Sequence, residues 1–260
     1  MDVKEWEQEA EGSTDRDAIQ RVVSKTLETA NQVEKTQPDI RKFGKLVPTL
    51  IERGIEGINL SMFDDTTKQA ILTEVGDECL RKGKINDAVK AYVFAGSRDR
   101  LVALGENYES MGMYSNAIDM YVYAKAKERL EVIGDKCIRD AKFSDAIKAL
   151  NHSGNRKKLL DVGDECMKRA KWDFALEIFS ILGNKQKLNE LGDMCCTSSQ
   201  LFGYACRAYE LAGDKERLSR LADLCLREGL INTAYKTYAT ADNTAMVAFI
   251  KENFMKGQQM

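Results

Sequence analysis

The residues that could do chemistry in this chain are few, and most of them recur at a fixed interval. Seven cysteines can ligate a metal, form disulfides or act as nucleophiles, and the single histidine, His152, can act as a base or a ligand. Five of the cysteines share one place, seven residues after a leucine: Cys79, Cys137, Cys166, Cys195 and Cys225. Tyr108 lies at the same distance from Leu101, where no cysteine occurs. A position that accepts either residue is a packing position, so the pattern predicts buried, reduced thiols and no metal site.

One acidic residue recurs at the same interval, and these residues are called the acidic row here: Asp77, Glu106, Asp135, Asp164, Asp193 and Asp223. Four of these have a base one helical turn later, in the pairs Asp77 with Arg81, Asp135 with Arg139, Asp164 with Lys168 and Asp223 with Arg227. Such pairs neutralise a helix face. Glu106 and Asp193 lack that base. Two roles stay open for them. They could face a lysine or arginine of a ligand, or they could bond to a junction base, which is a basic residue where the next copy of the pattern begins, such as Arg129 or Arg217.

The element that must position both rows is a tandem repeat. Its copies open at Leu72, Leu101, Leu130, Leu159, Leu188, Leu218 and Val247, with spacings of 29, 29, 29, 29, 30 and 29 residues. A period of this length indicates a solenoid of stacked supersecondary units. The fold class we expect is all-α, a right-handed α-solenoid of about six stacked helix pairs with an N-terminal helical cap.

Each copy contains two short helices, called A and B here in chain order. In the first copy Gly83 ends helix A and Gly96 ends helix B. A small residue recurs inside helix A, as Gly76, Gly105, Gly134, Gly163, Gly192 and Ala222; an alanine recurs in helix B, as Ala88, Ala117, Ala146, Ala175, Ala205 and Ala234. We expect the glycine to face that alanine, so that the two backbones approach closely. A large residue four positions after the alanine, such as Tyr92, then fills the remaining space.

The series Gly76, Gly83, Ala88, Tyr92 and Ala95 resembles the tetratricopeptide repeat (TPR), whose usual period is about 34 residues. The closing proline of that repeat is absent and the period is shorter. This short form looks more like the TPR-like solenoids of coatomer and intraflagellar-transport subunits, although the WD-repeat propeller that those solenoids follow is not present. The resemblance covers about 190 residues and implies an α-solenoid that binds proteins.

The chain divides into three predicted parts. Residues 1–14 are acidic and are expected to form a mobile tail. Residues 15–70 are expected to form the helical cap, with one helix from Asp15, a second near Asp39 that Pro48 kinks or restarts, and a third capped by Asp64 or Asp65. Residues 71–260 form the TPR-like solenoid. In its fifth copy, the stretch from Cys195 to Leu201 carries an extra residue and predicts a longer turn and a local change of superhelical pitch.

Composition excludes several functions. The net charge is -2, so there is no basic footprint for nucleic acid, and no apolar run can span a bilayer. The start of the chain lacks a charged-then-apolar leader, and we expect a cytoplasmic protein. No nucleotide-binding, Gly-x-Ser-x-Gly or His-Glu-x-x-His pattern occurs, and His152 aligns with Phe94, Tyr123 and Ile181 as a packing residue. We expect no catalytic, cofactor-binding or metal-binding residues and no enzymatic activity.

Protein binding is the remaining function. TPR domains that clamp an acidic peptide terminus place lysines and asparagines on helix A, whereas this chain has pairs such as Thr73 with Asp77. A basic or apolar partner peptide or helix, held in the concave groove, is therefore favoured. The candidate contacts are Glu106 and Asp193, and the tyrosine-rich second copy with Tyr114 and Tyr123. The alternative is a structural subunit of a larger transport or coat-like assembly that uses the ends and edges of the solenoid.

Overall fold

The computed structural model describes residues 47–53 and 60–255, and every regular element there is a helix. The α-helices are α2 (Val47–Arg53), α3 (Asp65–Arg81), α4 (Ile85–Ala95), α5 (Arg98–Ser110), α6 (Tyr114–Tyr123), α7 (Lys127–Arg139), α8 (Phe143–Ser153), α9 (Arg156–Lys168), α10 (Trp172–Leu182), α11 (Lys185–Cys195), α12 (Phe202–Ala212), α13 (Lys215–Arg227), α14 (Ile231–Thr240) and α15 (Thr244–Phe254). One 3-10 turn, η5 (Ser199–Leu201), precedes α12. The expected all-α class is confirmed for this part of the chain.

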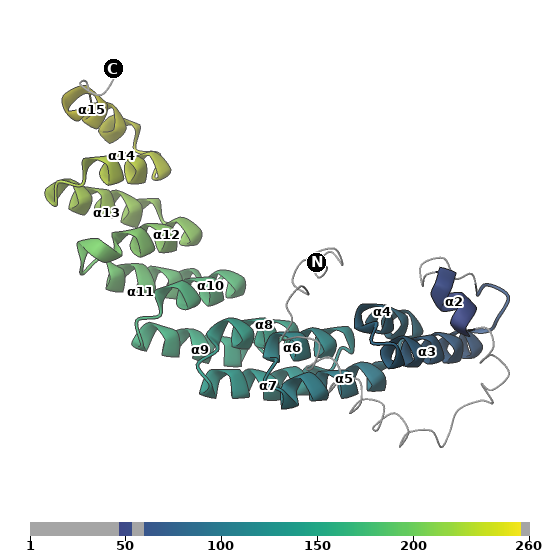
Figure 1. Ribbon diagram of the computed structural model, residues 1–260. Coiled ribbons are helices and arrows are strands. Elements are labelled where there is room, and N and C mark those ends of the chain that lie inside the picture. Colours follow the sequence, from purple (N-terminus) through teal and green to yellow (C-terminus); the bar gives the residue numbers. More distant parts are fainter. Residues whose placement is uncertain (1–46, 54–59, 256–260) are drawn as a thin grey trace. The chain divides into compact units, whose positions relative to one another are not determined.

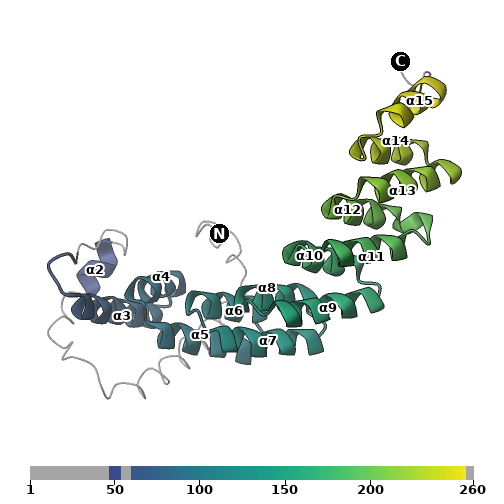
Figure 2. The same cartoon turned by 180° about the vertical axis from the view of Figure 1, so that it is seen from behind.

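Consecutive helices pack in pairs, and within each unit the second helix of a pair also contacts the first helix of the next pair. The chain forms two units, residues 1–153 and 154–260. In the described part of the first unit the pairs are α3/α4, α5/α6 and α7/α8; in the second they are α9/α10, α11/α12 and α13/α14, with α15 against α14. The paired helices lie side by side in Figure 1 and in the reverse view of Figure 2. This is the architecture of a helical repeat, with helix A first in each pair.

The helix ends follow the turn chemistry of the sequence. Asp64 caps α3 by accepting a hydrogen bond from the Thr67 amide, and bonds from the Thr66 and Thr67 hydroxyls and that amide lower the pKa of Asp64 to about 2. The predicted cap is confirmed. Gly83 and Gly96 both have positive φ, at 73° and 66°, where a residue without a Cβ avoids strain. The site equivalent to Gly96 in the next pair is held by Lys125, also with a positive φ of 55°.

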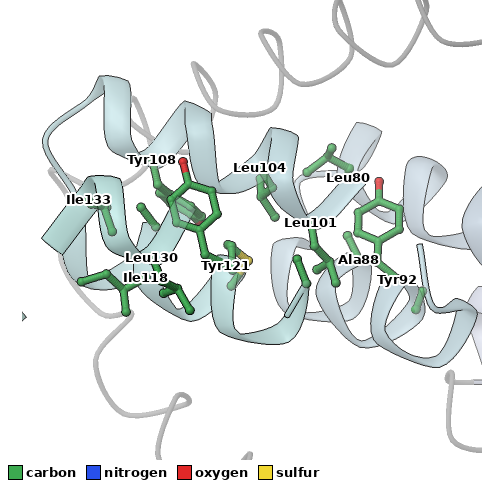
Figure 3. Close-up of a cluster of buried hydrophobic side chains, with 14 of the residues drawn as sticks. Leu80, Ala88, Tyr92, Leu101, Leu104, Tyr108, Ile118, Tyr121, Leu130 and Ile133 are labelled. Carbon is green, nitrogen blue, oxygen red and sulfur yellow. The ribbon is translucent and has the colours of Figure 1, made fainter. Parts of the chain in front are cut away.

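The core runs through the centre of each pair and corrects one expectation. A Cβ added to Gly76 would lie 2.5 Å from the ring of Tyr92, and one added to Gly105 would lie 2.6 Å from the ring of Tyr121. The glycine therefore makes room for the aromatic ring, not for the alanine methyl group that we expected it to face. Figure 3 shows Leu101 and Leu104 of α5 between these two buried rings. The ring of one pair thus packs on the helix A of the next.

The repeat leucines and cysteines lie in this core. The leucines that open the inner copies are buried: Leu101, Leu130, Leu159, Leu188 and Leu218. Leu72 and Val247, at the two ends of the series, are half-buried. The five aligned cysteines are buried and free, whereas Cys196 and Cys206 are half-buried. The prediction of buried packing thiols is confirmed.

The fifth copy has the longer turn that its sequence predicts. α11 ends at Cys195, and η5 fills the connection before α12 begins at Phe202. The expected tail, the helix from Asp15 and most of the helix near Asp39 lie outside the described residues. Of that last helix the structure describes α2, which contains Pro48.

Candidate protein-interaction site

The acidic row is used to join successive helix pairs. In the first unit, Oδ1 of Asp77 accepts a 2.7 Å hydrogen bond from the Tyr92 hydroxyl, and Oδ2 lies 2.9 Å from Nη2 of Arg100 at the start of the next helix A. Both charged side chains are nearly buried, at 11% and 12% exposure. Burial raises the pKa of Asp77, against the lowering effect of the Tyr92 bond and the Arg100 charge. These three residues tie α3, α4 and α5 together.

Glu106 forms the next link of the row in a more open setting. It pairs with Arg129 of α7, and the two side chains are 41% and 49% exposed. The Tyr121 hydroxyl, equivalent to that of Tyr92, instead donates to Oε2 of Glu109 at 2.8 Å. Because Glu106 is exposed and paired at only one end, its carboxylate is accessible to a second cation.

The second unit repeats the arrangement. Asp164 of α9 lies 3.1 Å from Nζ of Lys187, and Asp193 of α11 pairs with Arg217 of α13. Oδ1 of Asp193 also accepts a 2.8 Å bond from the Tyr209 hydroxyl. Partial burial opposes the effect, but the bonds from Arg217 and Tyr209 lower the pKa of Asp193. The junction-base role that the sequence left open for Glu106 and Asp193 is thus observed for both.

Two of the expected one-turn pairs are wrong. Arg81 bonds to Glu74 and Glu78, while Asp77 turns toward Arg100. Lys168 lies near Glu165, while Asp164 turns toward Lys187. The acidic row faces the next helix pair. A base at the start of that pair therefore reaches the carboxylate, whereas the base one turn later on the same helix bonds elsewhere. A one-turn rule treats each helix as isolated and misses this.

The two candidate tyrosines occupy different environments. Tyr114 is buried; its hydroxyl donates to Asp140 at 2.7 Å, and Nζ of Lys142 lies 4.1 Å from the centre of its ring. Tyr114 therefore joins α6 to the end of α7. Tyr123, in the last turn of α6, is 39% exposed and available for contact.

Sequence reasoning missed the exposed apolar side chains. Val132 on α7 lies one turn after Arg129, the partner of Glu106, and Met194 on α11 directly follows Asp193; both are exposed. A second set lies at one repeat position in the last turn of helix B: Phe94, Tyr123, Ile181 and Leu211. Tyr123 was a candidate contact from the sequence, but the other members of this set were not, because we assigned the position that aligns with His152 to packing. His152 itself is exposed.

Helix α15 departs from the other A helices. Lys251 stands at the glycine position and Met246 at the place of the junction base, by the repeat spacing. The other A helices have glycine or alanine at this position, packed against the helix B of the same pair, so the long lysine side chain departs from their pattern. Its aromatic residues Phe249 and Phe254 are exposed and contact each other edge to face, with ring centres 6.1 Å apart.

Among the described residues, no group of three or more histidine, cysteine or acidic side chains is placed to hold a metal ion. None of the helices in that part is both long and apolar enough to cross a membrane. The fold and the site define an all-helical protein of consecutively packed helix pairs with side-chain links between the pairs. No known family model matches the chain, and no curated protein matches it either.

Proposed function

We propose that this chain is a non-enzymatic protein–protein interaction scaffold that binds a segment of a partner protein across its A helices. One observation carries the proposal: each of the two open ion pairs of Glu106 and Asp193 is accompanied by an exposed apolar side chain. Val132 lies one turn after Arg129, the partner of Glu106, and Met194 directly follows Asp193. A partner peptide or helix with basic and apolar residues fits this combination.

The finer features of the fold belong to the same proposal. We infer a right-handed, TPR-like superhelix of about six repeats, supported by the spacing of 29 to 30 residues and by the helix pairing. The free cysteines support a reducing, cytoplasmic compartment. A concave groove along the A helices is the expected binding surface.

The experiment separates binding from structure. A partner is first identified by affinity purification from the native cell and its direct binding is measured with purified proteins. Glu106→Lys combined with Asp193→Lys is expected to weaken that binding at least tenfold, because it reverses charge at both contacts. The matched control, Arg129→Ala with Arg217→Ala, breaks the same two ion pairs but keeps the carboxylates, and is expected to bind as tightly as the wild type or more tightly. Equal losses in both variants would contradict the proposal, because they would mean that the carboxylates act only through the stack.

Tyr114 and Tyr123 provide a second comparison. Tyr123→Ala is expected to weaken partner binding with little change in Tm, since the side chain is exposed. Tyr114→Ala removes a buried link to Asp140 and is expected to lower Tm. If partner affinity is the same in both variants as in the wild type, these tyrosines do not belong to the interface.

The alternative, a structural subunit of a larger assembly, is favoured by α15. This helix exposes two aromatic side chains that contact each other, Phe249 and Phe254, and exposed aromatic residues are enriched in protein interfaces. Size-exclusion chromatography with light scattering tests it. Self-association that disappears in Phe249→Ser with Phe254→Ser supports the assembly role, and a monomer at all concentrations rejects self-assembly through α15.

A further inference from the structure

Two methionines are exposed in the described part of the chain, and one of them lies on the proposed binding surface. Met62, in the turn before α3, is 83% exposed, and Met194, in the last turn of α11, is 44% exposed. Met194 directly follows Asp193 of the acidic row. The other methionines that the structure describes are half-buried or buried, and Met120 and Met167 are only 1% and 8% exposed. The thioether beside Asp193 is therefore open to reagents from the solvent.

The fold does not need an apolar side chain at the position of Met194. Counted from the residue that opens each copy, the equivalent residues are Glu78, Asn107, Lys136, Glu165 and Leu224. Glu78 and Glu165 are partly exposed and form ion pairs with bases on their own helices. A polar group at this position is therefore compatible with the packing of α11 against α12. Methionine sulfoxide is polar, and at Met194 it changes the surface without entering the core.

The two thiols next to Met194 compete poorly for an oxidant. Cys195 is buried and Cys196 is half-buried. Burial raises the pKa of Cys195 to about 11 and also raises the pKa of Cys196, whose Sγ lies 3.3 Å from the Tyr209 hydroxyl. Both thiols are therefore protonated at neutral pH, whereas the thiolate is the form that attacks a peroxide. A thioether has no proton to lose, so its exposure decides how fast it is oxidised.

We propose that Met194 is an oxidation site through which hydrogen peroxide weakens the binding of a partner segment at α11. The Met194 sulfur takes one oxygen atom from the peroxide and is oxidised by two electrons, the O–O bond breaks, and the remainder leaves as water. The apolar contact that Met194 offers beside Asp193 is lost, because the sulfoxide is polar. Methionine sulfoxide reductases reverse this step. The inference rests on the proposed function, since it assigns the regulation of the same surface.

Peptide mapping by mass spectrometry tests the site itself and needs no partner. The folded full chain is treated briefly with hydrogen peroxide and then digested. Met194 and Met62 are expected to be oxidised at least about tenfold faster than Met120 and Met167, because burial excludes the reagent from the latter two. The Tm of the oxidised protein is expected to stay within about 1 °C of that of the untreated protein, because the core is not modified.

A binding measurement tests the consequence. The probe is a fluorescein-labelled amphipathic peptide with leucine on one face and lysine on the other, which has the chemistry proposed for the partner. Peroxide treatment is expected to weaken its binding to the wild type by about fivefold, measured by fluorescence anisotropy. Treatment with methionine sulfoxide reductase is expected to restore the affinity, whereas dithiothreitol alone is not.

Two variants assign the effect to one side chain. Met194→Leu keeps an apolar side chain that peroxide does not oxidise, and is expected to bind the peptide equally well before and after treatment. Met62→Leu is the matched control, because it removes the more exposed methionine outside the surface. It is expected to lose affinity on treatment as the wild type does.

The outcomes separate this inference from the proposed function. Oxidation of Met194 no faster than that of Met120, unchanged binding after Met194 is oxidised, or an equal loss of affinity in Met194→Leu would overturn the inference alone. A loss that dithiothreitol alone reverses would assign the effect to thiols such as Cys196 and would also overturn it. Failure of the untreated protein to bind the peptide would contradict the proposed function and this inference with it.

Discussion

The Tyr92 hydroxyl donates a 2.7 Å hydrogen bond to Oδ1 of Asp77, and both side chains are buried at the junction of the first helix pair with the second. The same tyrosine ring lies over Gly76, where a Cβ would collide with it. The Tyr92 ring thus sets the spacing between α3 and α4. Its hydroxyl binds the Asp77 carboxylate, which also bonds to Arg100 of α5 and so joins this pair to the next. The packing of these two helix pairs depends on both contacts of Tyr92.

The Asp77–Arg100 pair is expected to matter far more than the Glu106–Arg129 pair. Arg100→Met should destabilise the protein by about 3 kcal/mol, because it leaves a buried carboxylate without its cation. Arg129→Met should change stability by about 0–1 kcal/mol, since that pair is largely exposed. Urea denaturation followed by circular dichroism measures both. Similar losses would show that burial does not control the strength of these links.

Adding one methyl group should have opposite effects at two glycines. Gly192→Ala places a Cβ within 3 Å of the ring of Tyr209, whose hydroxyl is fixed by Asp193, and should destabilise by about 1–3 kcal/mol. Gly203→Ala has open space around it in α12 and should stabilise by up to about 1 kcal/mol through helix propensity. Thermal unfolding of the two variants measures both changes in stability. A stabilising Gly192→Ala would mean that the ring moves aside without cost.

The aligned cysteines should react slowly with a thiol reagent in the native protein. Cys79, Cys137 and Cys166 are buried, whereas Cys196 and Cys206 are half-buried. Mass spectrometry after short labelling should find the reagent on Cys196 and Cys206 first, and on all seven cysteines after denaturation. Rapid native labelling of Cys137 would contradict the inner position of helix A.

Alkaline pH should destabilise the fold. Burial raises the pKa of Cys137 to about 12 and those of Cys166, Cys195 and Cys225 to about 11, from an ordinary value of 9.0. Below pH 9 the thiols are protonated in both the folded and the unfolded state, so their full contribution to the free energy of unfolding is present there. As pH rises from 9 toward 11 the unfolded chain loses thiol protons that the folded chain keeps, and stability falls by at most about 1.4 kcal/mol per pH unit for each thiol.

Cys137→Ala tests this pH dependence. The variant loses packing at every pH, but it should show a shallower decline than the wild type between pH 9 and 11, because one titrating thiol is gone. Urea midpoints at pH 7.5, 9 and 10.5 measure the slope. Parallel slopes would assign the alkaline transition to other groups, such as the buried tyrosines.

Much of the fold was readable from local pattern. The spacing of leucines, cysteines and glycines gave the helix pairs, the buried positions and the longer turn before Phe202, because each depends on residues within one repeat. The Asp64 cap was readable for the same reason. The partner of Gly76 was assigned wrongly, since sequence spacing does not say whether the Ala88 methyl or the Tyr92 ring lies above the glycine.

The amino-acid sequence by itself determined the repeat, its period, the pairing of helices and the identity of the acidic row, because periodic apolar residues force short helices to bury one face each. Only the tertiary structure decided which base each carboxylate meets and which side chains stay exposed. Asp77 turns from Arg81 to Arg100, and Phe94 and Tyr123 remain exposed while Tyr114 is buried. These outcomes depend on how one pair stacks on the next, a relationship between residues more than twenty positions apart that no helical periodicity encodes.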